Sequence, residues 1–121
     1  MSDEHTTIAE ARRWLAEFVA ARDWQSYHDP KNLAMSIAIE AAELMEHFQW
    51  LRSDELAEHA RDPAQRQLIV DELADVLCYC LALANTLDVD VAASVREKLA
   101  KNAAKYPVER FRGRYHKPRD V

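Results

Sequence analysis

Apolar residues recur every three or four positions along most of the chain, and this spacing predicts helices rather than strands. The first predicted helix begins at the capping box Thr7-Ile8-Ala9-Glu10 and ends near Ala21. A second helix is predicted from about Asn32 to Leu51, where the apolar residues alternate by four and three. The segment between them is polar and aromatic, and Pro30 prevents one continuous helix.

The second half of the chain predicts three more helices. Ser53 can cap a short polar helix that ends near Arg61. The segment Asp62-Pro63-Ala64-Gln65 supplies an N-cap, a proline at the first helical position and a capping-box glutamine, so a long helix should follow to about Leu87. This helix is apolar on nearly every side, and a helix of that kind is normally buried.

The last predicted helix is capped by Asp88 or Asp90 and ends near Pro107. Because no segment is a candidate strand, the sequence predicts an all-α fold, a bundle of four to five helices. The long helix has more apolar surface than a chain of 121 residues readily covers. We therefore expect oligomerisation to complete the bundle, as a homotetramer built from dimers or as a homodimer.

Composition and charge narrow the function classes. Apolar residues make up 49% of the chain, which is typical of a globular protein, and the net charge of −5 argues against a nucleic-acid partner. Residues 108–121 hold five Lys or Arg and two acidic residues, a net charge of +3. We expect one domain over residues 1–107 and a basic C-terminal tail over 108–121, which could dock on a subunit or close over an anionic ligand.

The apolar segments do not indicate a membrane protein. The N-terminus lacks the apolar region of a signal peptide, and the uncharged stretch from Val76 to Leu87 is too short to span a bilayer. Cys78 and Cys80 are two residues apart on a helix and do not face each other, so we expect two free thiols. These features predict a cytoplasmic protein with no membrane partner.

Two pairs of carboxylates lie in otherwise apolar helical sequence. Glu40 and Glu43 form the first pair and Glu72 and Asp75 the second, each with i, i+3 spacing on one helical face. A single pair is usually a solvated face, and acids in the first turns of a helix are favoured by its dipole. Glu72 lies about ten residues into its helix, where that effect has faded. Buried carboxylates need a cation or a proton, so two facing pairs favour a metal site.

The ligand types indicate which metal. The sequence has no E-x-x-H motif for a di-iron bundle and no His/Cys spacing for zinc. Ligands that are all oxygen favour Mg²⁺, with Mn²⁺ as the alternative. Because such ions most often serve phosphates, and no P-loop is present, a triphosphate would be held by metal and side chains.

Two further groups of residues could complete a nucleotide site. A cationic helix face can attract phosphate, although by itself it is an ordinary solvated face: Lys98, Lys101, Asn102 and Lys105. Four ring side chains could stack on a base, although each alone is more often packing: Trp24, Tyr27, His28 and Trp50.

Taken in order, these residues resemble the MazG-like all-α nucleoside triphosphate pyrophosphohydrolases, especially the dCTP pyrophosphatase branch. The family pattern is E-x-x-E, a spacer, then E-x-x-D, as in Glu40-x-x-Glu43 and Glu72-x-x-Asp75. The similarity covers about Ala11 to Pro107. It includes AEFVAARDW, H-x-P-x-N-L, FQW, DELADVLCY and K-x-x-x-N-x-x-x-YP.

The resemblance implies Mg²⁺-dependent hydrolysis of a nucleoside triphosphate to a monophosphate and pyrophosphate, in nucleotide pool sanitation. The four acids would bind the metal, and a water activated by metal and carboxylate would attack the α-phosphorus. The resemblance also implies a set of substrate contacts. Trp24 and Trp50 would line the base pocket, Tyr79 would pack under the sugar, and the remaining contacts would be His28, Lys98, Asn102 and Tyr106.

One position departs from the dCTP enzymes. They have a His on the first helix, nine residues before the loop Trp, where this chain has Leu15. A dCTP-like pyrimidine is therefore the expected substrate, with loose selection of cytosine. Two other functional hypotheses stay open: a non-catalytic helical interaction module, and a metal-dependent phosphohydrolase acting on another nucleotide.

Overall fold

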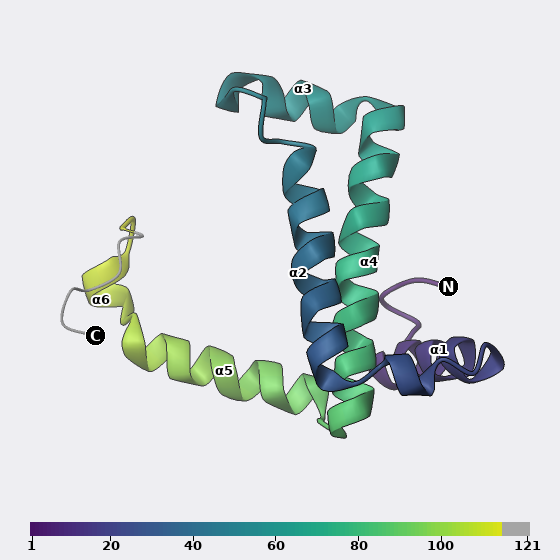
Figure 1. Ribbon diagram of the computed structural model, residues 1–121. Helices are drawn as coiled ribbons and strands as arrows, with labels where there is room; N and C mark the ends of the chain where they lie inside the picture. Colours follow the sequence, from purple (N-terminus) through teal and green to yellow (C-terminus); the bar gives the residue numbers. More distant parts are fainter. Residues whose placement is uncertain (115–121) are drawn as a thin grey trace. The chain divides into compact units, whose positions relative to one another are not determined.

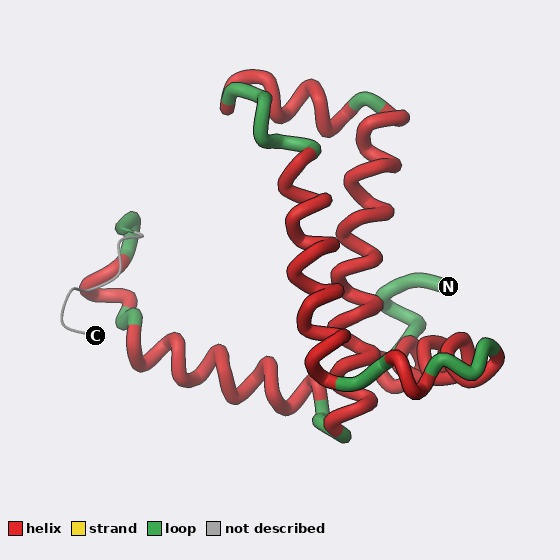
Figure 2. Tube along the Cα trace, in the orientation of Figure 1, coloured by secondary structure: helices red, strands yellow, loops and turns green. Residues whose placement is uncertain are grey.

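The computed structural model describes residues 1–114, in which the regular secondary structure is all helix, joined by loops and turns, with no strand (Figure 2). The all-α prediction is confirmed. The chain divides after Val89 into two compact units. The elements of the first unit are α1 Ile8–Ala21, η1 Gln25–Tyr27, α2 Pro30–Glu46, η2 Ser53–Glu55, α3 Leu56–Arg61 and α4 Pro63–Leu87. Those of the second are α5 Val91–Lys105 and α6 Val108–Phe111.

In the first unit, α2 and α4 lie side by side and antiparallel (Figure 1). The helix α1 packs across α4 near one end of this pair, and α3 packs against α4 at the other end (Figure 1). Arg12 fastens α1 to α4, because its Nε donates to Asn85 Oδ1 at 2.9 Å and its Nη2 donates to the Ala84 carbonyl at 3.2 Å. Asn85 Nδ2 donates back to the Arg12 carbonyl at 3.0 Å.

The helix starts follow the predicted caps. At α1, Glu10 N donates to Thr7 Oγ1 at 3.1 Å and Thr7 N donates to Glu10 Oε2 at 2.7 Å, which is a complete capping box. Asp62 caps α4 with Pro63 in the first turn, as expected. Asp90, rather than Asp88, caps α5. Asp88 instead ends α4 in the left-handed region, at φ 52°.

Two predicted boundaries were wrong. The second helix ends at Glu46 and not at Leu51, because the amides of His47 and Phe48 bond carbonyls three residues back and tighten the backbone into turns. Ser53 caps no helix. It lies inside the 3-10 turn η2, and neither η2 nor α3 has a side-chain cap.

The interior of the first unit is small. Among the described residues only Val19, Leu33 and Ala82 are buried, and Leu33, at 1% exposure, is the one large side chain that is fully enclosed. The long helix α4 was expected to have more apolar surface than one chain covers, and Leu73 and Leu77 are about half exposed within one chain. A single copy of the chain therefore leaves the apolar surface of this helix uncovered.

The second unit contains α5 and α6, joined at Pro107. Tyr106 packs its ring edge-on against Phe111, with centroids 5.1 Å apart, and Lys105 Nζ lies 5.6 Å from the Tyr106 ring centroid. The short helix α6 occupies the start of the predicted basic tail, and residues 115–121 of that tail lie outside the described residues.

No single helix within residues 1–114 is long and apolar enough to cross a membrane. Only α4 and α5 taken together would be long and apolar enough, judged by length and composition alone.

Candidate active site

Three glutamates converge between α2 and α4. Glu40 and Glu43 share one face of α2, and Glu72 comes from the antiparallel α4. One carboxylate oxygen from each lies within 4.8 Å of the other two, and all three residues are half-buried. The i, i+3 spacing on one helix and the packing of the other thus bring three negative charges together.

The cluster is electrostatically unfavourable without a cation. Burial raises the pKa of Glu40 to about 7, and the adjacent carboxyl groups of Glu43 and Glu72 and the charge of Asp75 add to the shift. The Oε2 atoms of Glu40 and Glu72 are buried and have no hydrogen-bond partner among residues 1–114. Unpaired buried oxygens are rare in folded proteins. Their number and type fit a hard divalent cation such as Mg²⁺.

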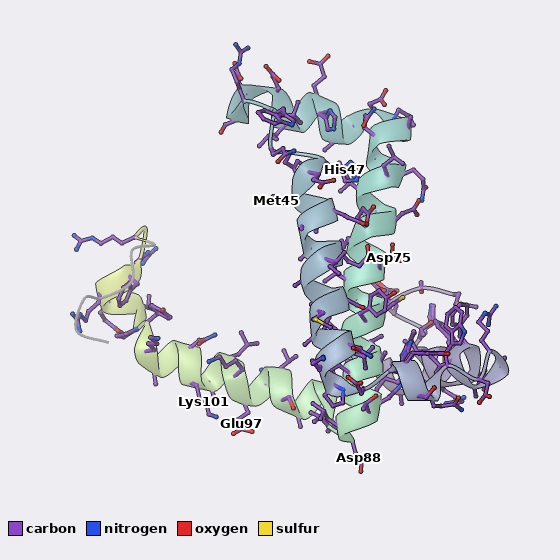
Figure 3. All side chains as sticks on the ribbon, viewed as in Figure 1. Met45, His47, Asp75, Asp88, Glu97 and Lys101 are labelled. Carbon is purple, nitrogen blue, oxygen red and sulfur yellow. The ribbon has the colours of Figure 1, made fainter. Side chains whose placement is uncertain are left out.

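Asp75 lies one turn of α4 beyond Glu72, about midway along that helix (Figure 3). Its carboxylate is not one of the three whose oxygens lie within 4.8 Å of one another. The charge of Asp75 nevertheless helps to raise the pKa of Glu40. Asp75 also lines the neighbouring cavity. It therefore connects the acidic cluster to that cavity.

The cavity lies between α1 and α4 and has a volume of about 400 Å³. Its walls are mainly apolar, with three polar groups among them. The lining residues are Trp14, Leu15, Phe18, Val19, Trp24, His28, Asp75, Cys78, Tyr79 and Ala82. Burial, with a contribution from the charge of Asp75, raises the pKa of the Cys78 thiol, so this side chain is a neutral wall group. A mostly apolar cavity with a few polar groups is typical of a small-molecule site.

Hydrogen bonds from neighbouring elements hold the loop before α2 against the cavity. Thr86 Oγ1, on α4, donates to the His28 carbonyl at 3.2 Å. Asn32 Nδ2 donates to the Tyr27 carbonyl at 3.2 Å. The His28 ring then faces Tyr79, with ring centroids 6.5 Å apart. Residues 27–32 thus carry His28 to the cavity wall through backbone contacts.

The raised pKa predicts how the metal-free chain responds to pH. Glu40 holds its proton more tightly in the folded state than in the unfolded state, where the pKa is near 4.5. The resulting loss of stability is absent below that pH and complete above about 7. With a chelator present, the Tm of the wild type should fall from about pH 5 to about pH 8 more steeply than that of Glu40→Gln.

Glu46→Gln is the matched control for this measurement, because Glu46 is exposed near the end of the same helix. It should keep the wild-type slope of Tm against pH. Equal slopes for the wild type and Glu40→Gln would contradict the raised pKa.

Comparison with known proteins identifies the family. The MazG-like family model matches residues 35–121, which include all four acids. The chain belongs to the MazG-like family. The predicted family resemblance is thereby confirmed.

Named relatives support this membership. The chain is 41% identical to dCTP pyrophosphatase 1 of Rattus norvegicus over 107 residues, covering 88% of this chain and 63% of the relative. It is 40% identical to dCTP pyrophosphatase 1 of Homo sapiens over 101 residues, covering 84% and 59%. The chain thus spans less than two thirds of the length of these curated relatives.

A solved structure shares the fold. The crystal structure of a pyrophosphatase from Archaeoglobus fulgidus is 42% identical to this chain, with a TM-score of 0.79. The match covers 88% of this chain and 98% of the archaeal one.

The residues expected to contact substrate occupy three places in this MazG-like chain. Trp24, His28 and Tyr79 line the cavity beside Asp75. Trp50 follows α2, is 86% exposed and is not part of that lining. The remaining three residues belong to the second unit. Lys98 is exposed there, and Asn102 and Tyr106 are half-buried.

Sequence reasoning missed part of the cavity wall. Trp14, Phe18 and Cys78 line the cavity, but none was expected to contact a ligand. One signal was present: Trp14 and Phe18 are four residues apart and share a face of α1. An aromatic pair at that spacing fits either a core stripe or a cavity wall, and only the packing of α1 on α4 distinguishes the two.

Proposed function

We propose that this MazG-like chain is a metal-dependent nucleotide pyrophosphohydrolase, which cleaves a nucleoside triphosphate to a monophosphate and pyrophosphate. The observation that carries the proposal is the cluster of Glu40, Glu43 and Glu72, with two unpaired buried oxygens, beside a largely apolar cavity of nucleobase-accommodating size. The names of its relatives, dCTP pyrophosphatase 1 and a pyrophosphatase, support the same reaction.

The metal ligands in this proposal are the three clustered glutamates and Asp75, and the ion is Mg²⁺ or Mn²⁺. When bound, such an ion offsets phosphate charge and lowers the pKa of a bound water. The chain itself contributes acceptors. Carboxylate oxygens that remain free of the ion accept the proton of the water that attacks the α-phosphorus. The new bond joins the water oxygen to that phosphorus, and the bond to the pyrophosphate oxygen breaks.

The cavity provides the base site. Trp24 is the stacking residue, Tyr79 packs under the sugar, and His28 is the polar group of the loop. Trp50 is the second stacking candidate, and its exposure requires the substrate or another segment to cover it. Lys98, Asn102 and Tyr106 are the proposed phosphate and sugar contacts from the second unit.

A substrate screen tests the reaction and the base site together. Release of pyrophosphate is measured for the four dNTPs, dUTP and CTP with Mg²⁺. We expect the highest kcat/KM for dCTP, with dTTP and dUTP within a modest factor. Leu15 lines the cavity without a hydrogen-bonding group, and one neutral hydrogen bond is worth only about a tenfold change in selectivity. A deoxynucleotide should exceed CTP, because a packed pocket leaves little room for a 2′-hydroxyl.

Substitutions locate the base in the same screen. Base–aromatic stacking contributes about 1–3 kcal/mol per base, so Trp24→Ala should lower kcat/KM roughly ten-fold or more. Trp50→Ala shows whether the second tryptophan contributes as well. A clear purine preference, or normal nucleotide binding by both variants, would place the base pocket elsewhere.

We also propose a second copy of the chain as a partner, as a dimer or a tetramer. Support comes from a stripe on α4 whose members alternate by three and four residues, the spacing of a helix–helix seam. The stripe consists of Val70, Leu73, Leu77, Cys80, Ala84 and Leu87. Its four largest apolar members are between 42% and 54% exposed in one chain.

A further inference from the structure

The helix α1 ends in a Schellman turn that leads directly into the cavity wall. Arg22 is the C-cap, and Asp23 has a left-handed backbone at φ 53°. Asp23 N donates to the Ala20 carbonyl and Trp24 N to the Val19 carbonyl, both at 3.1 Å. These are the two bonds of the motif. The turn reverses the chain, so that Trp24 folds back over the last turn of α1.

The side chains of this turn form a second set of contacts. The guanidinium of Arg22 lies 3.7 Å from the centroid of the Phe18 ring and 6.0 Å from that of Trp24. The two rings meet edge to face, with centroids 5.9 Å apart. Arg22 Nη1 also donates to the Phe18 carbonyl at 3.1 Å, which holds the guanidinium in place. Arg22 therefore stacks on the Phe18 ring and lies beside the Trp24 ring.

Both of those rings line the cavity, whereas Arg22 and Asp23 do not. Trp24 is 42% exposed, so packing alone leaves its ring free on one side. A tryptophan that must be ordered when a ligand binds weakens that binding, and one that is ordered beforehand does not. The contacts of Arg22 and the backbone of Asp23 supply this prior ordering.

We propose that Arg22 and Asp23 are positioning residues, which set the orientation of Trp24 and Phe18 in the cavity wall and thereby control the binding of the base. The identity of the ligand rests on the proposed function, but the placement of Trp24 does not. Arg22 acts on binding without touching the reacting phosphate, so its loss should raise KM and leave kcat nearly unchanged. Pre-ordering of one large side chain corresponds to a rise of a few-fold to about ten-fold.

The test uses the full chain labelled with 5-fluorotryptophan. The ¹⁹F resonances of Trp14, Trp24 and Trp50 are assigned from single Trp→Phe variants. In Arg22→Ala we expect the Trp24 resonance to shift toward that of a solvated, mobile ring, and the Trp50 resonance to stay in place. KM for dCTP with Mg²⁺ should rise within the range above. Arg22→Lys keeps the charge without the planar stack and should lie between the two.

Two further variants separate backbone from side chain. Asp23→Gly can adopt the left-handed conformation and should keep the wild-type Trp24 resonance, whereas Asp23→Val cannot do so without strain and should shift it. Arg13→Ala, at an exposed arginine on the same helix, is the matched control for the loss of charge. Circular dichroism confirms that each variant is folded.

An unmoved Trp24 resonance in Arg22→Ala, or a fall in kcat with KM unchanged, would overturn the proposal. So would a shift of the resonance without a change in KM, because positioning would then have no effect on binding. Failure of the proposed function is a separate result: the wild type would release no pyrophosphate. In that case the Trp24 resonance alone decides whether Arg22 and Asp23 position the ring.

Discussion

Changing Glu43 or Glu72 to glutamine is expected to reduce pyrophosphate release by more than about a hundred-fold while the chain stays folded. Even residues that only support a metal ligand typically change metal affinity or activity by about 10–100-fold, and a direct ligand should exceed that range. Glutamine keeps the shape of the side chain and removes its charge. The measurement is kcat/KM with Mg²⁺, together with Mg²⁺ affinity from calorimetry.

The same variants should be at least as stable as the wild type when metal is removed. The clustered carboxylates repel one another, and the buried Oε2 of Glu72 has no partner among residues 1–114. Removal of one charge relieves this repulsion, so Tm in chelator should stay level or rise. The matched control is Asp71→Asn, at an exposed acid adjacent to Glu72 that bonds Gln67 at 2.8 Å. It should keep near-normal turnover.

This experiment also separates the open alternatives. A non-catalytic helical module would show no pyrophosphate release and no Mg²⁺ dependence in the wild type. A phosphohydrolase with another substrate would lose its own activity in the same variants, but its product would not be pyrophosphate. Near-normal turnover by Glu43→Gln or Glu72→Gln would remove those residues from the metal site.

Most helix boundaries in this chain follow from short-range signals in the sequence. Thr7, Asp62 and Asp90 cap through short-range hydrogen bonds, and short-range patterns are visible in a sequence. The end of α2 at Glu46 has no such signal, because apolar residues continue to Leu51 at helical spacing. There, turns with bonds three residues back replace the helix.

The residues of the candidate site likewise divide into those that short-range spacing predicts and those that depend on long-range contacts. The acids were found from i, i+3 spacing within each helix, and their meeting requires only that α2 and α4 pack antiparallel. The aromatic wall depends on how α1 docks on α4 through Arg12 and Asn85, which are 73 positions apart. Spacing within one helix contains no information about such a contact. Trp50 illustrates the same limit, since its type suggested a pocket residue and its 86% exposure was not visible in the pattern.

Disruption of the α4 stripe is the second change with a large expected effect. The described part of one chain encloses a single large side chain, Leu33, which is too small an interior for a stable monomer. Leu73 and Leu77 are adjacent members of the stripe, 47% and 54% exposed. Covering them with a second copy removes this apolar area from water, at about 25 cal/mol for each Å².

We therefore expect the wild type to be a dimer or tetramer at micromolar concentration by light scattering, and a 14.0 kDa species would contradict this. Leu77→Arg places a charge in the stripe, so the variant should dissociate and melt at a lower temperature. Burial of the unpaired Arg charge between two copies costs too much for the interface to form around it.

The control is Val108→Arg, which adds the same charge at a position 67% exposed on α6, outside the stripe. It should keep the wild-type assembly and Tm. Because association is linked to folding, the Tm of the wild type should also rise with protein concentration, and that of Leu77→Arg should not. An unchanged assembly in Leu77→Arg would show that copies meet through another face. Loss of assembly with full stability would show instead that one chain is sufficient for folding, and that the exposed stripe on α4 contributes to association alone.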